Sequence, residues 1–337
     1  MKQALVFSAL GKGSGCYLRA AQVAEGLRLN GYDCRLHQPF LGNLPFSIDA
    51  ILSVPWFGLL ALFSRADFAL GIKPYPNCVL ALWILKLKGC RVVCDIDDLD
   101  WGWRAGLASR LARLAQLPAF FLLDQFSTHH PGIPKRLAAE GLAAGASWLP
   151  LDQGVDLDLF RPGPKAREPY LLFTAHLNVA CQLDVLMDLL FPLLAQDGCP
   201  RLVVAGGGPL LAEFRARHQG PKVSFSGAQT HSETAALTAS ARVCLAAYAP
   251  GPGNEFRVPM KVLEYLAAGR PVVSNLIAGL QPWKRYIYAS DDSAESWRRM
   301  LKKALGKGDG REKRGRAALL KTQSWKAVCS RFLTALG

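Results

Sequence analysis

Short apolar strands alternate with helices in the C-terminal half of the chain, and this alternation constrains the fold more than any other feature. The segment RLVVAGGG at 201–208 indicates a buried strand that runs into glycines, and a helix is expected at 210–218. VSFSGA at 223–228, a short helix at 231–240 and CLAAY at 244–248 follow. Such alternation predicts a parallel sheet with helices on both faces and with ligands at the carboxyl ends of its strands.

The segment NEFRVPMKVLEYLAAGRPVVSN at 254–275 predicts a further helix followed by a strand. Pro259 sets the backbone φ angle for a first helical turn. Gly269 supplies the stop, and the next strand begins at Pro271.

Three charged side chains share one face of this expected helix. Arg257, Lys261 and Glu264 are spaced four and then three residues apart, so at about 100° per residue they fall within an arc of roughly 60°. Two cations beside the unpaired N–H groups of a helix start suit a diphosphate, and a carboxylate one turn on suits the two hydroxyls of a ribose. A surface helix with a strip of ion pairs is the alternative interpretation.

The motifs GGGP at 206–209, FSG at 225–227 and KVLEYLAAGRPVV at 261–273 occur in this order. The order resembles the donor-binding half of the family-four glycosyltransferases, the large retaining GT-B group. The resemblance implies an α/β GT-B fold, in which two Rossmann-like domains with parallel sheets face each other across a cleft and a C-terminal helix crosses back to the N-terminal domain. It also implies that the donor is a nucleoside-diphosphate sugar.

The same resemblance assigns donor-binding positions. Glu264 corresponds to the carboxylate that holds the ribose, and the backbone of residues 258–260 corresponds to the helix start that takes the diphosphate. Arg257 and Lys261 match basic positions of a subgroup with the pattern R-x-P-x-K-x-x-E-Y. The complete implied set is Gly13, Gly15, Gly207, Gly208, Pro209, Gly227, Arg257, Val258, Pro259, Lys261 and Glu264.

The chain departs from the family pattern at two places. The glutamate usual eight residues before the ribose carboxylate is replaced by Phe256, with Glu255 one residue out of register. The Arg and Lys usual after the first strand of this domain are absent from residues 174–184. We therefore expect phosphate neutralisation to depend more heavily on Arg257 and Lys261.

Two domains are expected from the length of 337 residues, because one hydrophobic core rarely grows that large. The segment PLDQGVDLDLFRPGP at 150–164 is rich in Pro, Gly and Asp, and its G-V-D-x-x-x-F-x-P string resembles the segment that joins the domains in the family. A polar loop within a single domain is the alternative. The expected boundaries are 1–150 for the acceptor-side domain, 151–164 for the linker, 165–322 for the nucleotide-sugar domain and 323–337 for the returning helix.

The N-terminal half opens with a strand at 3–9, a glycine loop at 10–15 and a helix from about Cys16 to Asn30. This order is how a Rossmann-like domain approaches an anion, although the spacing matches neither the dinucleotide fingerprint nor a Walker loop. In the family this loop lies near the donor phosphates or the acceptor. Glycines needed only for a tight turn are the alternative.

Asp95, Asp97 and Asp98 follow the apolar segment RVVC. The resemblance implies that Asp97 or Asp98 orients the acceptor hydroxyl or takes its proton. A D-x-D site for Mg²⁺ or Mn²⁺ is one alternative, and solvated loop acids or a helix N-cap are others. For His129 and His130 we expect a structural role or a place at the edge of the cleft.

The positive charge is concentrated towards the C-terminus. The net charge is +14, and residues 298–331 hold twelve Lys or Arg and two acids, a local balance of +10. An anionic membrane surface fits this charge better than nucleic acid, because no zinc, recognition-helix or RNP-like pattern accompanies it. A second candidate membrane contact is 101–116, where Leu107, Leu111 and Leu114 form a stripe beside Arg104, Arg110 and Arg113. An amphipathic helix packed on its own domain is the alternative.

Nine scattered cysteines without a C-x-x-C pair, and a start without the features of a secretory signal, favour a reducing cytoplasm. No segment reaches the roughly 20 apolar residues of a spanning helix. The longest apolar stretch, 51–64, is broken by Pro55 and Gly58 and is expected to be buried.

The expected function is transfer of a hexose, with retention and without a metal ion or cofactor, from a nucleoside-diphosphate donor to a cell-surface glycan or lipid-linked acceptor. The protein is expected in the cytoplasm, at the inner face of the membrane. Two alternatives remain open: a nucleotide-sugar epimerase of the same fold, and a non-catalytic glycan-binding subunit.

Overall fold

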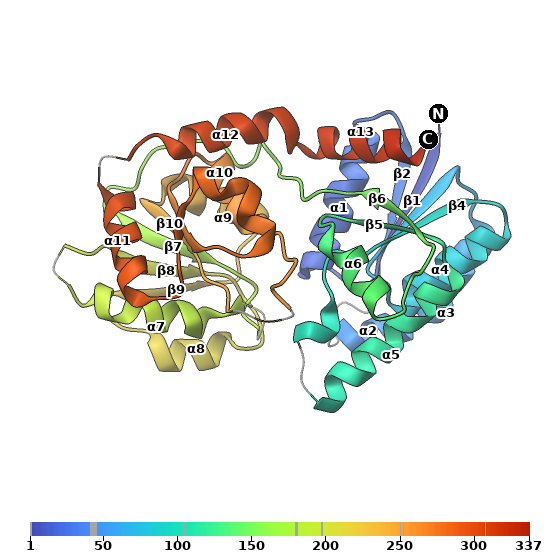
Figure 1. Cartoon of the computed structure of the whole chain (residues 1–337), viewed down its shortest axis with the longest axis horizontal. Helices are drawn as coiled ribbons and strands as arrows, with labels where there is room; N and C mark the ends of the chain where they lie inside the picture. The colour runs from blue at the N-terminus through green and yellow to red at the C-terminus, as the bar shows by residue number, and fades with distance from the viewer. Residues whose placement is uncertain are drawn as a thin grey trace. The chain divides into compact units, whose positions relative to one another are not determined.

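The computed structural model describes residues 2–40, 46–103, 106–178, 181–196, 198–249, 251, 253–306 and 308–337. The chain forms two compact units of similar size (Figure 1). The first unit consists of Met1–Gln153 together with Trp325–Gly337, and the second is Gly154–Ser324.

The first unit is built on a six-stranded parallel sheet with the order β2-β1-β3-β4-β5-β6. Its inner strands are short and apolar, and all five residues of β3 are buried, as expected for a parallel sheet covered on both faces. The strands are β1 (Gln3–Ser8), β2 (Asp33–His37), β3 (Phe68–Ile72), β4 (Arg91–Asp95), β5 (Gln125–Thr128) and β6 (Ser147–Pro150).

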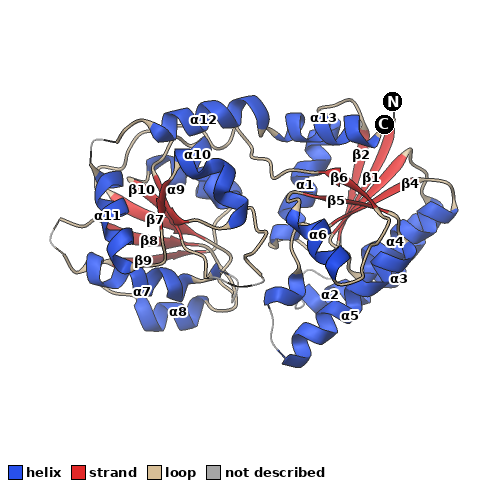
Figure 2. Ribbon diagram, in the orientation of Figure 1, coloured by secondary structure: helices blue, strands red, loops and turns tan. Residues whose placement is uncertain are grey.

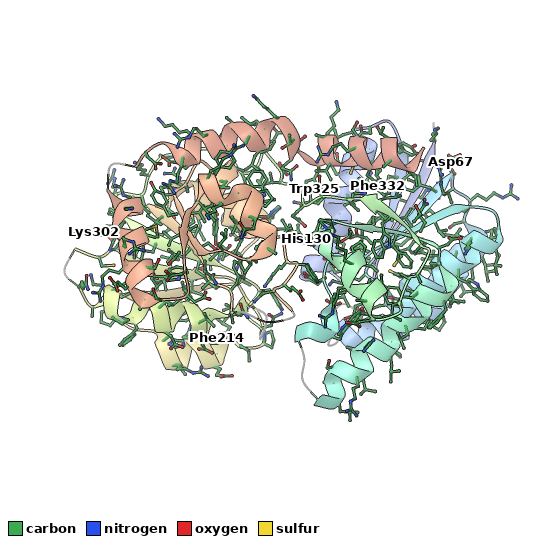
Figure 3. The ribbon with its side chains drawn as sticks, in the orientation of Figure 1. Asp67, His130, Phe214, Lys302, Trp325 and Phe332 are labelled. Carbon is green, nitrogen blue, oxygen red and sulfur yellow. The ribbon has the colours of Figure 1, made fainter. Side chains whose placement is uncertain are left out.

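Helices cover this sheet, and the C-terminal helix is one of them. Gly26 of α1 allows the close approach of α13, because a Cβ atom at Gly26 would lie 2.7 Å from the carbonyl oxygen of Trp325. Trp325 and Phe332 of α13 are buried in this unit (Figure 3). The helices are α1 (Gly15–Arg28), α2 (Phe46–Leu52), α3 (Val54–Phe63), α4 (Pro76–Leu87), the 3₁₀ helix η1 (Asp100–Trp103), α5 (Gly106–Leu122), α6 (Gly132–Ala139) and α13 (Trp325–Leu336).

The second unit has a parallel sheet with the order β12-β11-β10-β7-β8-β9, again covered by helices (Figure 2). Its strands are β7 (Tyr170–Thr174), β8 (Arg201–Ala205), β9 (Val223–Gly227), β10 (Val243–Ala246), β11 (Val272–Asn275) and β12 (Tyr288–Ser290). Its helices are α7 (Leu183–Leu194), α8 (Leu211–His218), α9 (His231–Ser240), α10 (Met260–Ala267), the 3₁₀ helix η3 (Ala278–Tyr286), α11 (Ala294–Leu305) and α12 (Arg311–Thr322).

Successive residues of β7 enter two separate cores of the second unit. Leu171 and Phe173 belong to the core formed with α7 and α11, whereas Tyr170 and Leu172 belong to the core formed with α10. Successive side chains of a strand point to opposite faces, so an apolar strand must be covered on both. The two parallel sheets with helices on both faces, and the return of α13 to the first unit, confirm the α/β two-domain fold predicted from the sequence.

The prediction that the apolar stretch 51–64 is buried is wrong. Ile51, Leu59 and Leu62 are 63%, 50% and 53% exposed, and Phe63 is 87% exposed. The stretch forms the end of α2 and all of α3, and only one face of α3 packs on the rest of the unit, through Phe57, Gly58 and Ala61. Hydropathy alone does not reveal whether an apolar helix is covered on all sides.

Candidate functional site

The strand order of the second sheet reverses between β7 and β10. In doubly wound sheets this switch point is where loops diverge and ligands bind, at the carboxyl ends of the strands. The helix α10 follows β10 in the chain, and its residue Lys261 reaches β7: the Nζ atom lies 4.2 Å from the ring centroid of Phe173. The start of α10 is therefore at the switch point.

The Lys261 ammonium lies in an apolar setting. No ion pair to it is found in the part of the chain that the structure describes. Burial, together with the nearby Arg257 guanidinium, lowers the pKa of Lys261 to about 7, although Cys181 and Glu264 act in the opposite direction. An anion placed against Nζ would favour the charged form and raise this pKa again.

The sequence predicted that Arg257 shares a helical face with Lys261 and Glu264, but the structure places Arg257 before the helix. The helix starts at Met260, and Pro259 is its N-cap residue with an extended backbone at φ −72° and ψ 118°. A proline also disfavours helical geometry in the residue before it, so Val258 ends the loop rather than starting the helix. The Arg257 guanidinium extends from that loop and lies 5.5 Å from the centroid of the Tyr248 ring. It is still close enough to Lys261 to lower the pKa of that lysine.

Two contacts fix the loop before α10. A Cβ atom at Gly279 would lie 2.1 Å from the carbonyl oxygen of Arg257, so η3 presses directly on this segment. Gln182 Oε1 accepts hydrogen bonds from Ala249 N at 2.7 Å and Asn254 Nδ2 at 2.8 Å. Residues 174–184 lack the basic pair of the family pattern. They instead hold the loop through the uncharged side chain of Gln182.

The Glu264 carboxylate is nearly buried, with 7% of the residue exposed. Its Oε1 lies 3.3 Å from His231 Nε2, and the His231 ring packs 5.0 Å from the ring of Phe160. His231 is the first residue of α9, whose start is fixed by a capping box between Thr230 and Glu233. The sequence prediction did not include His231, although its position inside the Thr-x-x-Glu pattern of residues 230–233, at the first residue of the helix, was a readable signal.

The glycines after β8 serve close backbone packing. Added Cβ atoms would lie 1.7 Å from Ala175 O at Gly206 and 2.4 Å from Leu177 O at Gly208. Leu177 N donates to Gly207 O at 2.7 Å, so the loops after β7 and β8 run against each other. Pro209 follows in this loop, and Gly227 ends β9 at the same edge of the sheet. This packing brings the predicted glycine positions to the carboxyl edge of the sheet.

The other candidate residues lie in the first unit, and the glycine loop after β1 is at the switch point between β1 and β3. Ser14 caps α1: its hydroxyl accepts from Tyr17 N at 3.1 Å and donates to Gly11 O at 2.8 Å. Gly13 has φ +91° in the preceding loop, and Gly15 is the first helical residue. The loop geometry matches the predicted strand, glycine loop and helix, and Ser14 together with the positive φ of Gly13 accounts for its tight turn.

Asp97 is held in an ion pair that the sequence did not indicate. Lys73 Nζ lies 3.0 Å from Asp97 Oδ1 and 2.7 Å from Asp100 Oδ1. Burial disfavours the charged form of Asp97, but Lys73, with weaker contributions from Arg19 and His129, outweighs it and holds the pKa at about 2. Such a carboxylate stays ionised and is a weak proton acceptor.

Asp95 takes part in a second buried ion pair. Arg19 Nε lies 2.7 Å from Asp95 Oδ2, and both residues are at most 1% exposed. Arg19 also donates to Leu151 O at 2.7 Å and to Gln153 Oε1 at 2.9 Å. Among the described residues no group of three His, Cys, Asp or Glu side chains is placed to hold a metal ion. Asp95 and Asp97 are instead neutralised by cations of the protein.

The paired histidines after β5 have local contacts. His130 Nδ1 accepts a hydrogen bond from Gly132 N at 3.0 Å at the start of α6. His129 contributes to the low pKa of Asp97. These contacts agree with the structural role that the sequence suggested.

Residues 168–305 match a family model described as Glycosyl transferases group 1. This segment contains the loops after β7 and β8, the start of α10 and the Glu264–His231 pair. Residues 168–305 are therefore similar to the glycosyl transferases group 1 family, and we call this segment the group 1 domain. The group 1 domain thus coincides with most of the second unit.

Among curated proteins, the GDP-mannose-dependent alpha-(1-6)-phosphatidylinositol dimannoside mannosyltransferase of Mycobacterium tuberculosis is 34% identical over 139 residues. The alignment covers 38% of this chain and 35% of that protein, so the chain spans about a third of the length of the curated relatives it matches.

Solved glycosyltransferase structures share the fold of the whole chain. Sucrose-phosphate synthase from Thermosynechococcus elongatus has a TM-score of 0.78 at 14% identity, covering 99% of this chain and 98% of that one. A glycosyltransferase from Rickettsia africae has a TM-score of 0.71 at 13% identity, covering 99% and 97%. These likenesses show that both units together have the GT-B glycosyltransferase fold.

Proposed function

We propose that the protein is a glycosyltransferase that moves a hexose from a nucleoside-diphosphate donor to a glycan or lipid-linked acceptor, with retention of the anomeric configuration. One observation within the group 1 domain carries the proposal. Lys261 is a cation without an ion-pair partner among the described residues, and the nearly buried carboxylate of Glu264 lies three residues further along α10. A diphosphate joined to a ribose presents the complementary groups in the same order.

In the proposed complex the diphosphate lies at the start of α10. Lys261 and Arg257 provide positive charge, and the first N–H groups of the helix add to it. Glu264 accepts hydrogen bonds from the ribose hydroxyls, and His231 holds the carboxylate in place. Gly207, Gly208, Pro209 and Gly227 form the neighbouring wall, where their backbone allows close approach.

Catalysis in this proposal consists of holding the acceptor hydroxyl against the anomeric carbon and stabilising the departing diphosphate. Lys261 favours the departure of the diphosphate, because the negative charge that develops on the diphosphate restores the positive charge of the lysine. In the first unit, Asp97 orients the acceptor rather than taking its proton, because its pKa of about 2 makes it a weak base. Asp98 is the remaining candidate for the proton acceptor. Gly13 and Gly15 lie where the loop after β1 leads into α1.

The proposal includes no metal ion and no cofactor beyond the donor. Lys261 and Arg257 offer the charge that a divalent ion would otherwise supply to the diphosphate. The acids of the first unit that resemble a D-x-D site already have Arg19 and Lys73 as partners.

The name of the mycobacterial relative guides the choice of substrates to test. It pairs GDP-mannose with a phosphatidylinositol-linked acceptor, so GDP-mannose is the first donor to examine and a lipid-linked glycan the first acceptor. We propose a cytoplasmic location, which the nine free cysteines support.

Turnover of a donor panel tests the proposal. The protein is incubated with UDP-, GDP-, ADP- and dTDP-sugars, with and without glycan acceptors, and released nucleotide and sugar products are followed by mass spectrometry. Acceptor-dependent release of nucleotide, with the product linkage retaining the donor configuration, is expected. Conversion of the donor sugar without an acceptor would identify an epimerase instead, and binding without either reaction would identify a non-catalytic subunit.

A further inference from the structure

Exposed apolar side chains gather on the helices of the first unit. Of the seventeen large apolar residues that are exposed in the described part of the chain, fourteen lie between Phe40 and Phe121. The second unit has only two in its described residues, Phe191 and Leu320. Scattered single residues of this kind are normal on a protein surface, but a concentration on one set of helices marks an interaction surface.

The helix α3 turns a fully apolar face outward. Trp56, Leu59 and Phe63 are 43%, 50% and 87% exposed and follow one another at the spacing of one helical face. On the opposite face Gly58 packs against Leu80 of α4, where an added Cβ atom would lie 3.2 Å from a leucine methyl group. The exposed face is thus not the one that attaches α3 to its unit.

The helix α5 shows the same arrangement. Leu107, Leu111 and Leu114 are 71%, 56% and 60% exposed, while Ala112 and Gln116 on the other side are buried. The leucine stripe that the sequence analysis described is therefore exposed rather than packed on the domain. Arg104, named with that stripe, lies outside the described residues.

The helix α4 connects these two exposed faces. It packs against α3 on one side and α5 on the other, so the three helices form one layer (Figure 1). Trp83 and Leu87 of α4 are 37% and 70% exposed. We use the term helical face for the exposed apolar residues of α3, α4 and α5 together.

The charges on this layer have one sign. The helices α3, α4 and α5 contain no Asp or Glu. Arg65 follows α3 and Arg110 lies on α5, and both are exposed. Lys88 Nζ donates to the carbonyl oxygens of Leu62 and Ser64, both at 2.6 Å, so its ammonium lies beside the end of α3. Cations at the edge of an apolar face match the interface of an anionic bilayer.

We propose that the helical face docks on an anionic lipid bilayer, with its apolar side chains in the headgroup region and Arg65, Lys88 and Arg110 near the lipid phosphates. No helix of the described residues is long and apolar enough to cross a membrane, so the contact is interfacial. A second copy of the chain fits less well: a symmetric dimer would bring these cations against their own copies, and the three helices offer no carboxylate to pair with them.

This inference moves the membrane contact away from residues 298–331. In the structure that basic stretch is divided, because α11 and α12 belong to the second unit and α13 to the first. Several of its cations have partners inside the protein, such as Arg311 with Asp309 and Arg331 with Asp152. The inference does not depend on the proposed glycosyl transfer, since docking is measured without donor or acceptor.

Vesicle co-sedimentation tests the proposal. The full chain should pellet with vesicles that contain phosphatidylglycerol and much less with phosphatidylcholine alone. The double variant Leu59→Gln/Phe63→Gln and the double variant Leu107→Gln/Leu111→Gln should each weaken partition about tenfold or more, because each removes two immersed apolar side chains. Phe191→Gln/Leu320→Gln, which changes exposed apolar residues of the second unit, is the matched control and should bind as the wild type does.

A second measurement detects contact between the helical face and lipid directly, with a variant that keeps an aromatic side chain on α3. Vesicles with brominated acyl chains should quench more fluorescence from the wild type than from Trp56→Phe, because Trp56 is in contact with lipid. Loss of vesicle binding in Lys302→Gln/Lys303→Gln, but not in the variants of α3 and α5, would overturn the proposal in favour of the basic stretch. Failure to bind anionic vesicles would overturn it too, and a dimer that Phe63→Gln dissociates would identify a second copy as the occupant.

Discussion

At the scale of single residues, the donor site proposed here depends on side chains whose properties come from their surroundings. Lys261 is an ordinary lysine in sequence, and its pKa falls to about 7 because it is buried against Phe173 beside Arg257. The spacing of Lys261 and Glu264 was readable because both lie on one short helix. The His231–Glu264 contact was not, because it joins residues 33 positions apart.

Donor affinity should fall as the pH rises above about 7. In the free protein Lys261 loses its proton near that pH, and the bound diphosphate raises the pKa again. Affinity is then full below pH 7 and declines by at most about tenfold per unit up to the pKa of the complex. Calorimetric titration with a nucleotide-sugar from about pH 6 to about pH 9 measures this, and Lys261→Arg, which stays charged, should abolish the decline. A constant affinity of the wild type across this range would refute the role of Lys261.

His231 should act through Glu264. Replacing His231 with Ala should weaken donor binding by about 0.5–1.5 kcal/mol, the range for one hydrogen bond. The same change in a Glu264→Gln background should cost less, because the two residues act as a pair. His218→Ala is the control, since His218 contacts Asp184 at 2.9 Å in the same unit. Additive effects of His231→Ala and Glu264→Gln on calorimetric affinity would show that the two side chains are independent.

At the scale of elements, the fold was predictable where local pattern determines it. Apolar strands separated by helices predicted the parallel sheet, and Gly269 predicted the end of α10. The start of α10 was misplaced because Pro259 occupies the N-cap and leaves Arg257 in the loop. The prediction for 51–64 failed because the hydropathy of a segment does not determine what covers it. The ion pairs Arg19–Asp95 and Lys73–Asp97 join segments that are far apart in the sequence and leave no local signal.

The contact of η3 with the loop before α10 should be essential for the site. Gly279→Ala places a Cβ atom 2.1 Å from the Arg257 carbonyl oxygen, so the loop must move. We expect a loss of about 1–3 kcal/mol in the free energy of unfolding, as for other overpacked sites, together with weaker donor binding. Gly220→Ala is the matched control, because no atom lies within 4 Å of its added Cβ. Urea unfolding and calorimetry check both effects, and unchanged values for Gly279→Ala would contradict this account of the loop.

At the scale of the whole molecule, the fold shared with sucrose-phosphate synthase extends over 99% of the chain, whereas the family match covers residues 168–305. The second unit was therefore the more readable from sequence. The candidate residues of the first unit depend on long-range contacts, as Arg19 shows by joining α1 to Asp95, 76 residues away, and to Leu151, 132 residues away.

Turnover should not require a divalent ion. Lys261, Arg257 and the start of α10 provide the charge for the leaving diphosphate, so excess EDTA should leave the rate of nucleotide release unchanged. Added Mg²⁺ or Mn²⁺ should have no effect beyond that of ionic strength. Abolition of activity by EDTA with recovery on Mn²⁺ would point to a metal at Asp95, Asp97 and Asp98 and would require the Lys73 pair to open.

The most direct test of the central claim, that the second unit binds a nucleoside-diphosphate sugar at α10, is calorimetric donor affinity in Glu264→Gln. The substitution keeps the size of the side chain and removes its charge, and affinity should fall by about 1.5–3 kcal/mol, the range for hydrogen bonds to a charged group. Glu213→Gln on α8, an exposed acid of the same unit, should bind the donor as the wild type does. If Glu264→Gln binds the donor with unchanged affinity while its thermal unfolding matches the wild type, the ribose does not lie at Glu264 and the proposed site is wrong.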